Sequence, residues 1–358
     1  MHRSHRAQHL LRGVRYSVCA VPLAEKALIA QIRRMAATAG RTRAPGTRVN
    51  PTIVTGIGDD CAVLRVAPGR GDGKDTLLTT DFTLEGIHFR RDWHPAESVG
   101  HRCLARGLSD IAAMGGEPVA AFLSLALPRK LPQSWVGRFA RSLISLAEKY
   151  GITLAGGDTT ESPGGILADI IVVGSVPKGK AVLRSGARPG DRLYVSGELG
   201  GSAAAVWKMR KMRKKPKRGL KLGEYPRHFF PEPRIELGRI LREKGLASAM
   251  IDTSDGLSTD LGHICEESRV GAEVSAELIP RASVGRPARE VDLEFALHGG
   301  EDYELLFTSP PGRRVPSRIV GVPITQIGHV TRSRKVILRN KTGVEYELGP
   351  RGWEHFRS

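Results

Sequence analysis

The chain has 358 residues, of which 40% are hydrophobic and 42 are glycine. This length allows two domains with complete cores, and the composition fits a turn-rich globular enzyme better than a fibrous or disordered protein. The net charge of +18 is unevenly placed, with basic clusters in residues 1–50 and in Lys208–Lys221. Because no apolar run approaches the roughly 20 residues that cross a bilayer, we expect no membrane segment.

The four cysteines are widely separated and form no Cys-x-x-Cys pair: Cys19, Cys61, Cys103 and Cys265. A zinc site or a disulfide framework is therefore not expected. The same pattern suits a reducing compartment, so we predict a cytoplasmic protein.

Two basic segments stand apart from the rest of the chain. Residues 1–21 are predicted to be a disordered basic tail. A second segment, about residues 207–222, is predicted to be a basic insertion. A polyanion-binding surface is the alternative interpretation of the charge. The run Lys208–Lys221 has no interleaved aromatic side chains on which bases would stack, so we favour a solvated insertion and do not expect a nucleic-acid partner.

The first half of the chain alternates strand-like and helical patterns. Apolar residues recur at helical spacing in Ala24–Ala37, and Gln133–Tyr150 is the clearest amphipathic helix. We also predict a helix over Glu97–Met114. Strands are predicted at 53–54, 76–78, 119–127, 152–155 and 169–176, and the strand at 119–127 is expected to be buried. Residues 177–190 are predicted to form a hinge between two domains, 22–180 and 181–358.

The second half continues the alternation. We predict a strand at Arg192–Ser196, a helix opening at Gly200, a helix over Pro231–Lys244 with proline at its start, and a strand at Ala272–Ile279. The loop Asp252–Gly256 is predicted to lead into another helix. The fold class is therefore α/β (α+β).

Acidic residues recur at places where an apolar segment ends. The first is the turn Gly56–Asp60, and the others contain Asp81, Asp110, Asp158 and the pair Asp252 and Asp255. If these loops converge, their carboxylates repel one another strongly unless hard cations such as Mg²⁺ neutralise them. Such a site typically binds phosphate. Of the two adjacent acids in the first turn, one can enter a cleft while the other caps or anchors the loop, and Asp59 is expected to be the structural cap.

The two common nucleotide-binding fingerprints are missing. Gly69–Lys74 does not have the spacing of a Walker A loop, and Gly56-x-Gly58 lacks the third glycine of a dinucleotide fingerprint. A nucleotide site would therefore have to be of another kind.

Seven motifs, in order and at their spacings, resemble the thiamine-monophosphate kinase family of the aminoimidazole ribonucleotide synthetase superfamily. They are GIGDDCAVL, TTDFTLEGIHF, LSDIAAMGGEP, GGDTTESPGG, LRSGARPGD, IDTSDGLSTDLGH and GGEDYELLFT. The resemblance runs from about Ala24 to Phe356. It implies a two-domain fold whose N-terminal domain contributes strands to the β-barrel of a homodimer. It also implies ATP- and Mg²⁺-dependent phosphorylation of thiamine monophosphate to thiamine diphosphate. We expect direct in-line transfer, because the acceptor phosphate needs no general base and every candidate nucleophile in these motifs has a ligand or structural role.

The resemblance also implies roles for single residues. The implied magnesium ligands are Asp60, Thr79, Thr80, Asp81, Asp110, Asp158, Asp252 and Asp255, of which Asp60, Asp110, Asp252 and Asp255 are the candidate catalytic residues. The implied nucleotide-binding residues are Gly157, Asp158, Arg184 and Ser254. Those implied for thiamine monophosphate are His88, Glu301 and Trp353.

Each role has a simpler competitor. One of Thr79 and Thr80 is expected only to satisfy the backbone of a turn, and His88, Glu301 and Trp353 have packing or capping roles as alternatives. Arg106-Gly107 stands where the family more usually has a small residue and an asparagine. Aminoimidazole ribonucleotide synthetase is the alternative function within the superfamily, and a basic nucleic-acid-binding protein is the alternative from another class.

Overall fold

A computed structural model of the chain describes residues 25–41, 53–65, 73–211 and 222–352. The predicted tail 1–21, most of the basic insertion and Trp353 lie outside these residues. The chain forms two compact units, one of residues 1–45 with 354–358 and one of residues 46–353. In the first unit the predicted helix is confirmed as α1 (Glu25–Arg41). In the described part of the chain, no helix combines the length and apolar character needed to span a membrane.

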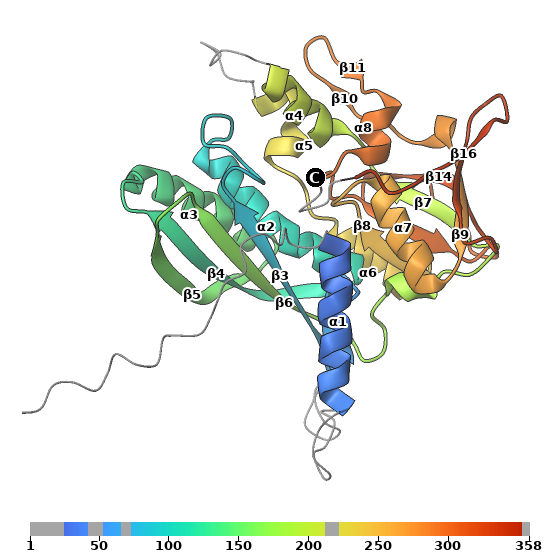
Figure 1. Cartoon of the computed structure of the whole chain (residues 1–358), viewed down its shortest axis with the longest axis horizontal. Helices are drawn as coiled ribbons and strands as arrows, with labels where there is room; N and C mark the ends of the chain where they lie inside the picture. The colour runs from blue at the N-terminus through green and yellow to red at the C-terminus, as the bar shows by residue number, and fades with distance from the viewer. Residues whose placement is uncertain (1–24, 42–52, 66–72, 212–221, 353–358) are drawn as a thin grey trace, which may run out of the picture. The chain divides into compact units, whose positions relative to one another are not determined.

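The first half of the larger unit is built on a six-stranded sheet, drawn from blue to green in Figure 1. Its strand order is β1-β2-β3-β6-β4-β5. Only β4 and β5 pair in parallel, and all the other neighbours are antiparallel. The strands are β1 (Ile53–Thr55), β2 (Ala62–Arg65), β3 (Lys74–Leu84), β4 (Glu117–Pro128), β5 (Thr153–Ser162) and β6 (Leu167–Pro177).

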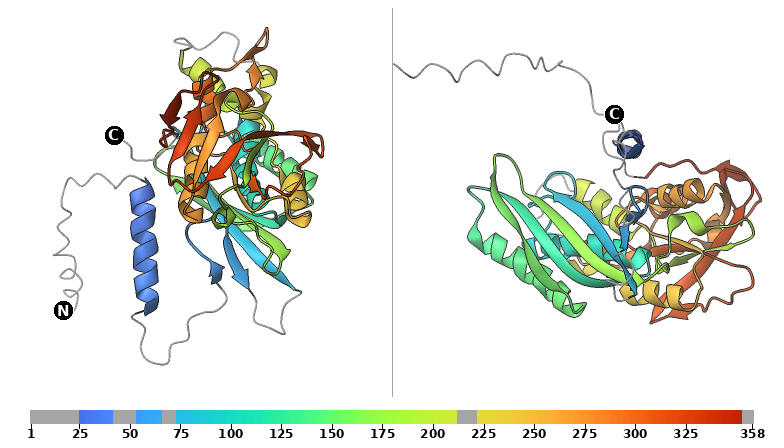
Figure 2. Two further views of the ribbon diagram at one scale, coloured as in Figure 1. Left: turned by 90° about the vertical axis from the view of Figure 1, so that its right-hand side faces the viewer. Right: turned by 90° about the horizontal axis from the view of Figure 1, so that it is seen from below.

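Two helices lie against one face of this sheet (Figure 2): α2 (Ala96–Ala113) and α3 (Gln133–Lys149). In α3 the predicted apolar stripe is buried, with Phe139 and Leu143 almost fully enclosed. Because successive side chains of a strand point to opposite faces, the sheet's other face carries exposed apolar residues such as Phe82 and Phe122. This second face is called the open face below.

The second half contains an eight-stranded mixed sheet, drawn from yellow-green to red in Figure 2. Seven strands follow the order β16-β15-β9-β14-β7-β12-β8, and β13 pairs with β14. The strands are β7 (Arg192–Ser196), β8 (Ala249–Asp252), β9 (Gly271–Ser275), β12 (Leu305–Ser309), β13 (Arg318–Ile319), β14 (Val322–Thr331), β15 (Val336–Arg339) and β16 (Glu345–Glu347). A short hairpin, β10 (Ser283–Val284) with β11 (Arg289–Glu290), stands apart from it.

Five helices accompany this sheet: α4 (Gly201–Lys211), α5 (Pro226–Phe229), α6 (Ile235–Glu243), α7 (Leu257–Ser268) and α8 (Leu293–His298). Helix α7 packs on the sheet, and its residues Leu261 and Ile264 are fully buried. Single 3₁₀ turns occupy Arg184–Gly186, Leu222–Glu224 and Ala276–Leu278.

Helix α2 connects the two halves. It contacts β3 and β6 of the first sheet and also β8, α5 and α6 of the second half. One apolar cluster accordingly includes Leu108 and Ile111 from α2 together with Leu237, Met250 and Phe307 from the second half. The C-terminal end of α2 is therefore fixed beside the end of β8, which places Asp110 beside Asp252.

Several predicted elements differ from the observed ones. β3 and β5 do not end before their acidic motifs, because Thr79–Asp81 and Gly156–Asp158 lie inside these strands. The prediction that 119–127 is a buried strand was wrong, since β4 has only Ala121 fully buried. Helix α6 begins at Ile235 rather than Pro231, because Pro233 disfavours helical backbone at Glu232, the residue before it.

The predicted basic insertion begins inside a helix. Residues 207–211 form the last turns of α4, and Met209 is buried against Tyr225 and Phe229. Residues 212–221, which hold most of the remaining basic side chains, lie outside the described residues. Within the described part of this segment Met209 is therefore packed, whereas Trp207 and the basic side chains of residues 208, 210 and 211 are exposed.

Candidate active site

Three acidic residues from separate parts of the sequence meet between the two sheets. Asp60, Asp110 and Asp252 each offer a carboxylate oxygen, and these oxygens lie within 4.8 Å of one another. Asp60 follows the turn after β1, Asp110 is in the last turn of α2, and Asp252 ends β8. We call these three residues the acidic cluster. Its formation confirms that at least three of the acidic motifs converge.

Hydroxyl and guanidinium donors hold the acidic cluster in place. Ser109 Oγ donates to Asp252 Oδ2 at 2.5 Å, and Thr79 Oγ1 donates to Asp110 Oδ2 at 2.5 Å. Arg184 Nη2 donates to Asp60 Oδ1 at 2.5 Å. Each carboxylate therefore has one oxygen anchored by the protein.

The electrostatics of the cluster are unfavourable for three ionised carboxylates. Burial and the neighbouring Asp252 raise the pKa of Asp110 well above its ordinary value. Burial, and then Asp60, raise the pKa of Asp252 to about 7. Like charges this close disfavour the ionised form unless a cation compensates them.

The residues present fit a magnesium ion. Asp60 Oδ2 is buried and has no hydrogen-bond partner, although the carboxylate is close to two others. Leaving such an oxygen buried and unpaired is costly. Mg²⁺ prefers carboxylate oxygens, so an ion bound by the cluster would supply the missing partner and relieve the repulsion.

Asp59 has the predicted capping role. Its Oδ1 accepts from the backbone N–H of Asp60 at 3.1 Å, and its Oδ2 accepts from the backbone N–H of Arg184 at 3.3 Å. Burial, and then the charge of Asp60, raise the pKa of Asp59 to about 7. Asp59 therefore fastens the acidic turn to the 3₁₀ turn that carries Arg184.

The other predicted metal ligands divide between the two faces of the first sheet. In β3, Thr79 and Asp81 face α2, whereas Thr80 faces the open face and donates to Asp169 Oδ1 at 2.6 Å. Asp158 is on the same open face, because the register pairs it with Ser124 and pairs Ser124 with Asp169. The structure thus brings Thr79 to the acidic cluster and pairs Thr80 with a further acid, Asp169. Asp158 lies on the same open face, two strands away from Asp169.

Asp81 has an arginine as its partner. Arg106 Nε and Nη2 donate to its two carboxylate oxygens at 2.8 and 2.9 Å. Asp81 does not belong to the group of oxygens that forms the acidic cluster.

Gly157 is a position where only glycine fits. Its φ is +149°, and a Cβ there would lie 1.7 Å from the carbonyl oxygen of Leu123 in the neighbouring β4. A side chain at this position would separate the two parallel strands. Whatever it contacts in a complex, Gly157 allows the close approach of β4 to β5.

Ser254 and Asp255 lie in the loop between β8 and α7, both half-buried. The carbonyl of Ser254 accepts from the backbone N–H of Glu301 at 2.8 Å. Asp255 is outside the acidic cluster, but its charge helps to raise the pKa of Asp252 and of the buried Asp260. Asp260 caps this loop by accepting from the backbone N–H of Gly256 at 2.9 Å.

Two of the residues predicted to bind thiamine monophosphate are linked by one buried arginine. Arg102 Nη2 donates to Glu301 Oε1 at 2.5 Å and to the carbonyl of His88 at 3.3 Å. The ring of His88 accepts at Nδ1 from the backbone N–H of Leu84 at 3.0 Å. Glu301 has a φ of +66° and lies in a turn. This turn, and not a helix or strand, sets the direction of the Glu301 side chain. Trp353 lies outside the described residues.

Sequence reasoning missed Arg102, Arg106 and Asp169. Arg102, Arg106 and Asp110 are each four residues apart on α2, a spacing that places them on one face of a helix. That spacing was the available signal for the two arginines. For Asp169 no signal existed, because its neighbourhood depends on strand pairing.

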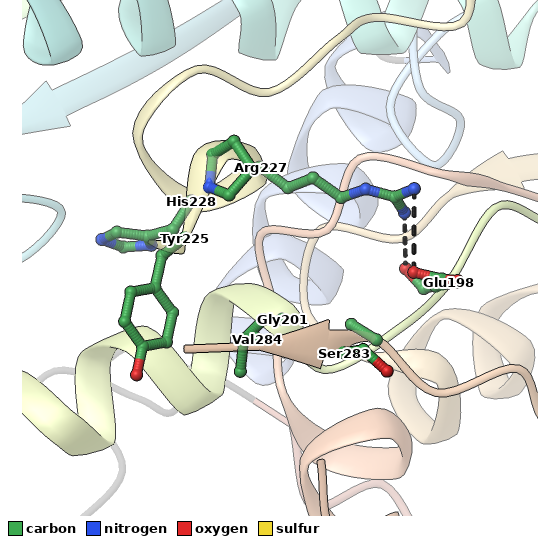
Figure 3. Close-up of a pocket in the computed structure, with 9 residues that line it drawn as sticks. Glu198, Gly201, Tyr225, Arg227, His228, Ser283 and Val284 are labelled. Carbon is green, nitrogen blue, oxygen red and sulfur yellow. Dashed lines mark hydrogen bonds and ion pairs between the residues drawn. The ribbon is translucent and has the colours of Figure 1, made fainter. Parts of the chain in front are cut away.

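A small pocket lies apart from the acidic cluster, and none of the predicted site residues lines it. It is lined in part by Glu198, Tyr225, Arg227, His228 and Val284. Figure 3 shows Arg227 turned toward Glu198, with a separation of 3.9 Å between Nη2 and Oε2. His228 links the pocket to the site, because its carbonyl accepts from Arg102 Nη1 at 3.0 Å.

We expect the metal-free protein to lose stability as the pH rises from about 4 to about 7. In this range the unfolded Asp252 is already ionised, near its ordinary pKa of about 3.9, while the folded one keeps its proton up to a pKa of about 7. The folded state then binds more protons than the unfolded state, so raising the pH favours unfolding. Melting temperatures in EDTA at pH 5 and pH 8 measure this effect, which we expect to be about 2–4 °C or more.

Mg²⁺ should reverse that loss at pH 8, and Asp252→Asn should weaken the pH dependence. A metal-free melting temperature that is the same at both pH values would contradict the charge repulsion that we assign to the cluster.

Fold and site together define the class of protein. The family model for the N-terminal domain of AIR synthase related proteins matches residues 58–176, and the model for the C-terminal domain matches residues 188–340. The acidic cluster lies where these two matched regions meet, with Asp60 and Asp110 in the first and Asp252 in the second. The chain is thus a two-domain protein of AIR synthase-like fold.

Comparison with individual proteins is more specific, and the chain belongs to the thiamine-monophosphate kinase family. It is 39% identical to the thiamine-monophosphate kinase of Salmonella typhimurium over 313 residues, which cover 85% of this chain and 92% of that protein. Identity to the Bacillus subtilis enzyme is 32%, covering 87% and 97%. Among solved structures, AaThiL complexed with AMPPCP and TMP has a TM-score of 0.76 and 31% identity, covering 95% of this chain and 99% of that one. The hydrogenase maturation protein HypE of E. coli shares only the fold, at 18% identity and a TM-score of 0.64.

Proposed function

We propose that this protein transfers a phosphoryl group from ATP to thiamine monophosphate and forms thiamine diphosphate. The observation that carries the proposal is the acidic cluster, with its unpaired Asp60 oxygen, in a chain of this family. A related protein, AaThiL, has been crystallised with AMPPCP and TMP, a nucleotide analogue and the proposed acceptor.

Magnesium is the proposed cofactor, and Asp60, Asp110 and Asp252 are the residues that would hold it. When bound, Mg²⁺ would neutralise phosphate charge in the transition state. Thr79, which donates to Asp110, positions one of these ligands. Thr80, Asp158 and Asp255 remain proposed ligands on the strength of the family resemblance, and Thr80 and Asp158 would act from the open face.

The two substrates would contact different sides of the cluster. Arg184, anchored on Asp60, is proposed to bind ATP phosphate, with Gly157, Asp158 and Ser254 as further nucleotide-binding residues. His88, Glu301 and Trp353 are proposed to bind the acceptor. A carboxylate such as Glu301 suits the positive charge of a thiazolium ring, and an aromatic such as Trp353 suits its flat face.

The chemistry requires no general base from the protein. The second pKa of a phosphate monoester is about 6, so the acceptor is largely dianionic at neutral pH. The protein's task is then to bring two anions together and hold them in line, which Arg184 and the acidic cluster serve by position.

We expect direct transfer and therefore inversion of configuration at the γ-phosphorus. Ser109 and Thr79, whose hydroxyl groups contact the cluster, donate to carboxylates and are not placed as nucleophiles. ATP that is chiral at the γ-phosphorus tests this expectation. Retention of configuration, or a phosphorylated enzyme trapped without acceptor, would rule out a single displacement.

A homodimer is the proposed assembly, with the open face of the first sheet as the contact. Phe82 is 55% exposed and Val119 54%, and β5 leaves one edge without a strand partner within the described residues. Exposed apolar faces and unpaired edges of this kind are usually covered by a partner.

We further propose a cytoplasmic location, and a domain boundary near residues 180–181, between β6 and β7.

The direct test is to incubate the purified protein with ATP, Mg²⁺ and thiamine monophosphate, and to follow thiamine diphosphate. Thiamine and water serve as alternative acceptors in parallel reactions. Formation of thiamine diphosphate only when thiamine monophosphate and Mg²⁺ are both present supports the proposal. ATP consumption that does not depend on thiamine monophosphate would overturn it.

A further inference from the structure

Arg106 lies on α2 midway between the acidic cluster and the proposed acceptor residues. It is four residues from Arg102, which holds Glu301, and four residues from Asp110 of the cluster. Residues at this spacing are neighbours on one helix face, about one turn apart. This face of α2 therefore extends from Arg102, which contacts the residue proposed to bind the thiazolium ring, to Asp110, one of the residues proposed to bind magnesium.

Its guanidinium group is fixed along one edge. Nε and Nη2 donate to both carboxylate oxygens of Asp81, at 2.8 and 2.9 Å. Nη1 lies 3.7 Å from Glu301 Oε1, beyond the range of a good hydrogen bond. The Arg106 side chain is 14% exposed and so is not fully enclosed by protein. Arg106 Nη1, on a guanidinium that Asp81 holds in place, is thus directed toward Glu301.

The pairing also changes what Asp81 can do. Two charge-assisted hydrogen bonds from one guanidinium neutralise its carboxylate and occupy both of its oxygens. The acidic cluster, in contrast, contains an oxygen with no partner at all. Asp81 therefore does not need a cation as the cluster does.

The charges match the proposed acceptor. Thiamine monophosphate carries a cationic ring at one end and a phosphate dianion at the other. Glu301 and Arg106 present an anion and a cation, with Oε1 and Nη1 3.7 Å apart and Arg106 on the side of Asp110. Guanidinium is well suited to phosphate oxygens because it is always charged and presents several donors in one plane. An acceptor placed with its ring at Glu301 would direct its phosphate past Arg106 toward the cluster.

We propose that Arg106 binds the phosphate of the acceptor, and that Asp81 positions Arg106 instead of binding magnesium. This inference rests on the proposed function, because thiamine monophosphate is the acceptor that it invokes. It assigns phosphate recognition to a residue at which this chain departs from the family pattern.

The test compares two ligands that differ only by the phosphate. Binding of thiamine monophosphate and of thiamine is measured by calorimetry on the full chain and on Arg106→Met, Arg106→Lys and Arg138→Met. Charged hydrogen bonds contribute about 1.5–3 kcal/mol each. Arg106→Met is thus expected to weaken binding of thiamine monophosphate about 10- to 100-fold, while thiamine binding stays unchanged. Arg106→Lys, which keeps the charge, should lose less, and the exposed Arg138 serves as the control for losing an arginine.

A second arm counts bound Mn²⁺ as a probe of the magnesium sites. Asp81→Asn is expected to bind as many Mn²⁺ ions as the unaltered chain, whereas Asp110→Asn binds fewer. The proposal is overturned if Arg106→Met weakens both ligands equally, if it weakens neither, or if Asp81→Asn loses Mn²⁺ as Asp110→Asn does. Unaltered protein that neither binds nor phosphorylates thiamine monophosphate would overturn the proposed function and this inference together, whereas an active enzyme with one of the three results above would overturn this inference alone.

Discussion

Asp252→Asn is expected to lower kcat about a hundredfold or more while the protein stays folded. The amide keeps the size of the side chain, and its oxygen can still accept from Ser109 Oγ. What it removes is one negative charge from the acidic cluster, and with it a magnesium ligand. Losing one strong electrostatic contact to a transition state typically costs about 10²–10³ in kcat, or roughly 3–4 kcal/mol.

The same substitution should affect stability in the opposite direction. Without metal, the repulsion between Asp252 and Asp60 is relieved, so the melting temperature of the variant in EDTA should rise above that of the unaltered chain. A variant that simply misfolds cannot give this result. The stabilisation that Mg²⁺ confers should shrink in parallel.

Two matched variants make this comparison sharp. Asp292 is exposed and precedes α8, so Asp292→Asn should leave both activity and the effect of Mg²⁺ unchanged. Asp255→Asn removes an acid from the same loop but outside the cluster, and we expect it to lower activity less than Asp252→Asn does. Unchanged turnover of Asp252→Asn at saturating Mg²⁺ would contradict the assignment of the cluster as the catalytic metal site.

The motifs in the sequence were sufficient to find the acidic cluster, because its members occur in long motifs at fixed positions. They also indicated α2 and α3 correctly, since an apolar stripe at helical spacing seldom arises outside a helix. Local patterns of this kind depend only on residues that are close together in the sequence.

Strand faces could not be predicted in the same way. The resemblance implied Thr79, Thr80 and Asp81 as magnesium ligands, with one threonine expected only to satisfy a turn. The strand turns Thr80 to the open face, and Thr79 and Asp81 toward α2. Glycine and threonine suggested a loop for Gly156–Asp158, yet β5 continues through it because β4 supplies a hydrogen-bonded neighbour. The apolar composition of β4 suggested burial, whereas much of it lies on the open face.

Ion pairs between segments that are distant in the sequence could not be predicted either. Arg102 meets a residue 199 positions away and Arg106 one 25 positions away, and only the packing of α2 between the two sheets makes these pairs. Glu304 is a further example. It follows Glu301 in an acidic motif that was interpreted from its glycine turn, and its own role became visible only in the structure.

Glu304→Gln is expected to destabilise the protein by about 3–5 kcal/mol, the usual cost of breaking a buried ion pair from one side. The Glu304 side chain is 1% exposed. It accepts from Ser196 Oγ at 2.5 Å, from Arg227 Nη1 at 3.2 Å, and from both Nε and Nη2 of Arg234, the former at 2.7 Å. A glutamine would present a donor to a guanidinium that remains buried and charged.

The backbone around Glu304 is shaped to this contact. A Cβ on Gly197, at the end of β7, would lie 2.0 Å from Glu304 Oε1, and this glycine has a φ of +60°. Arg234 comes directly before α6, and Glu304 directly before β12. The pair therefore fastens α6 to the second sheet, and α6 in turn packs on α2, which carries Asp110.

Urea denaturation of Glu304→Gln beside Glu243→Gln measures the effect with a suitable control. Glu243 pairs with Arg239 at 2.9 Å on the surface of α6, and an exposed pair of this kind contributes about 0.3–0.5 kcal/mol. The double variant Arg234→Met with Glu304→Leu should recover part of the loss, because it removes the unpaired guanidinium of Arg234 together with its partner carboxylate. A loss below about 1 kcal/mol in Glu304→Gln, comparable to that of an exposed pair, would mean that Arg227 and Arg234 reach water and that this contact does not fasten α6 to the second sheet.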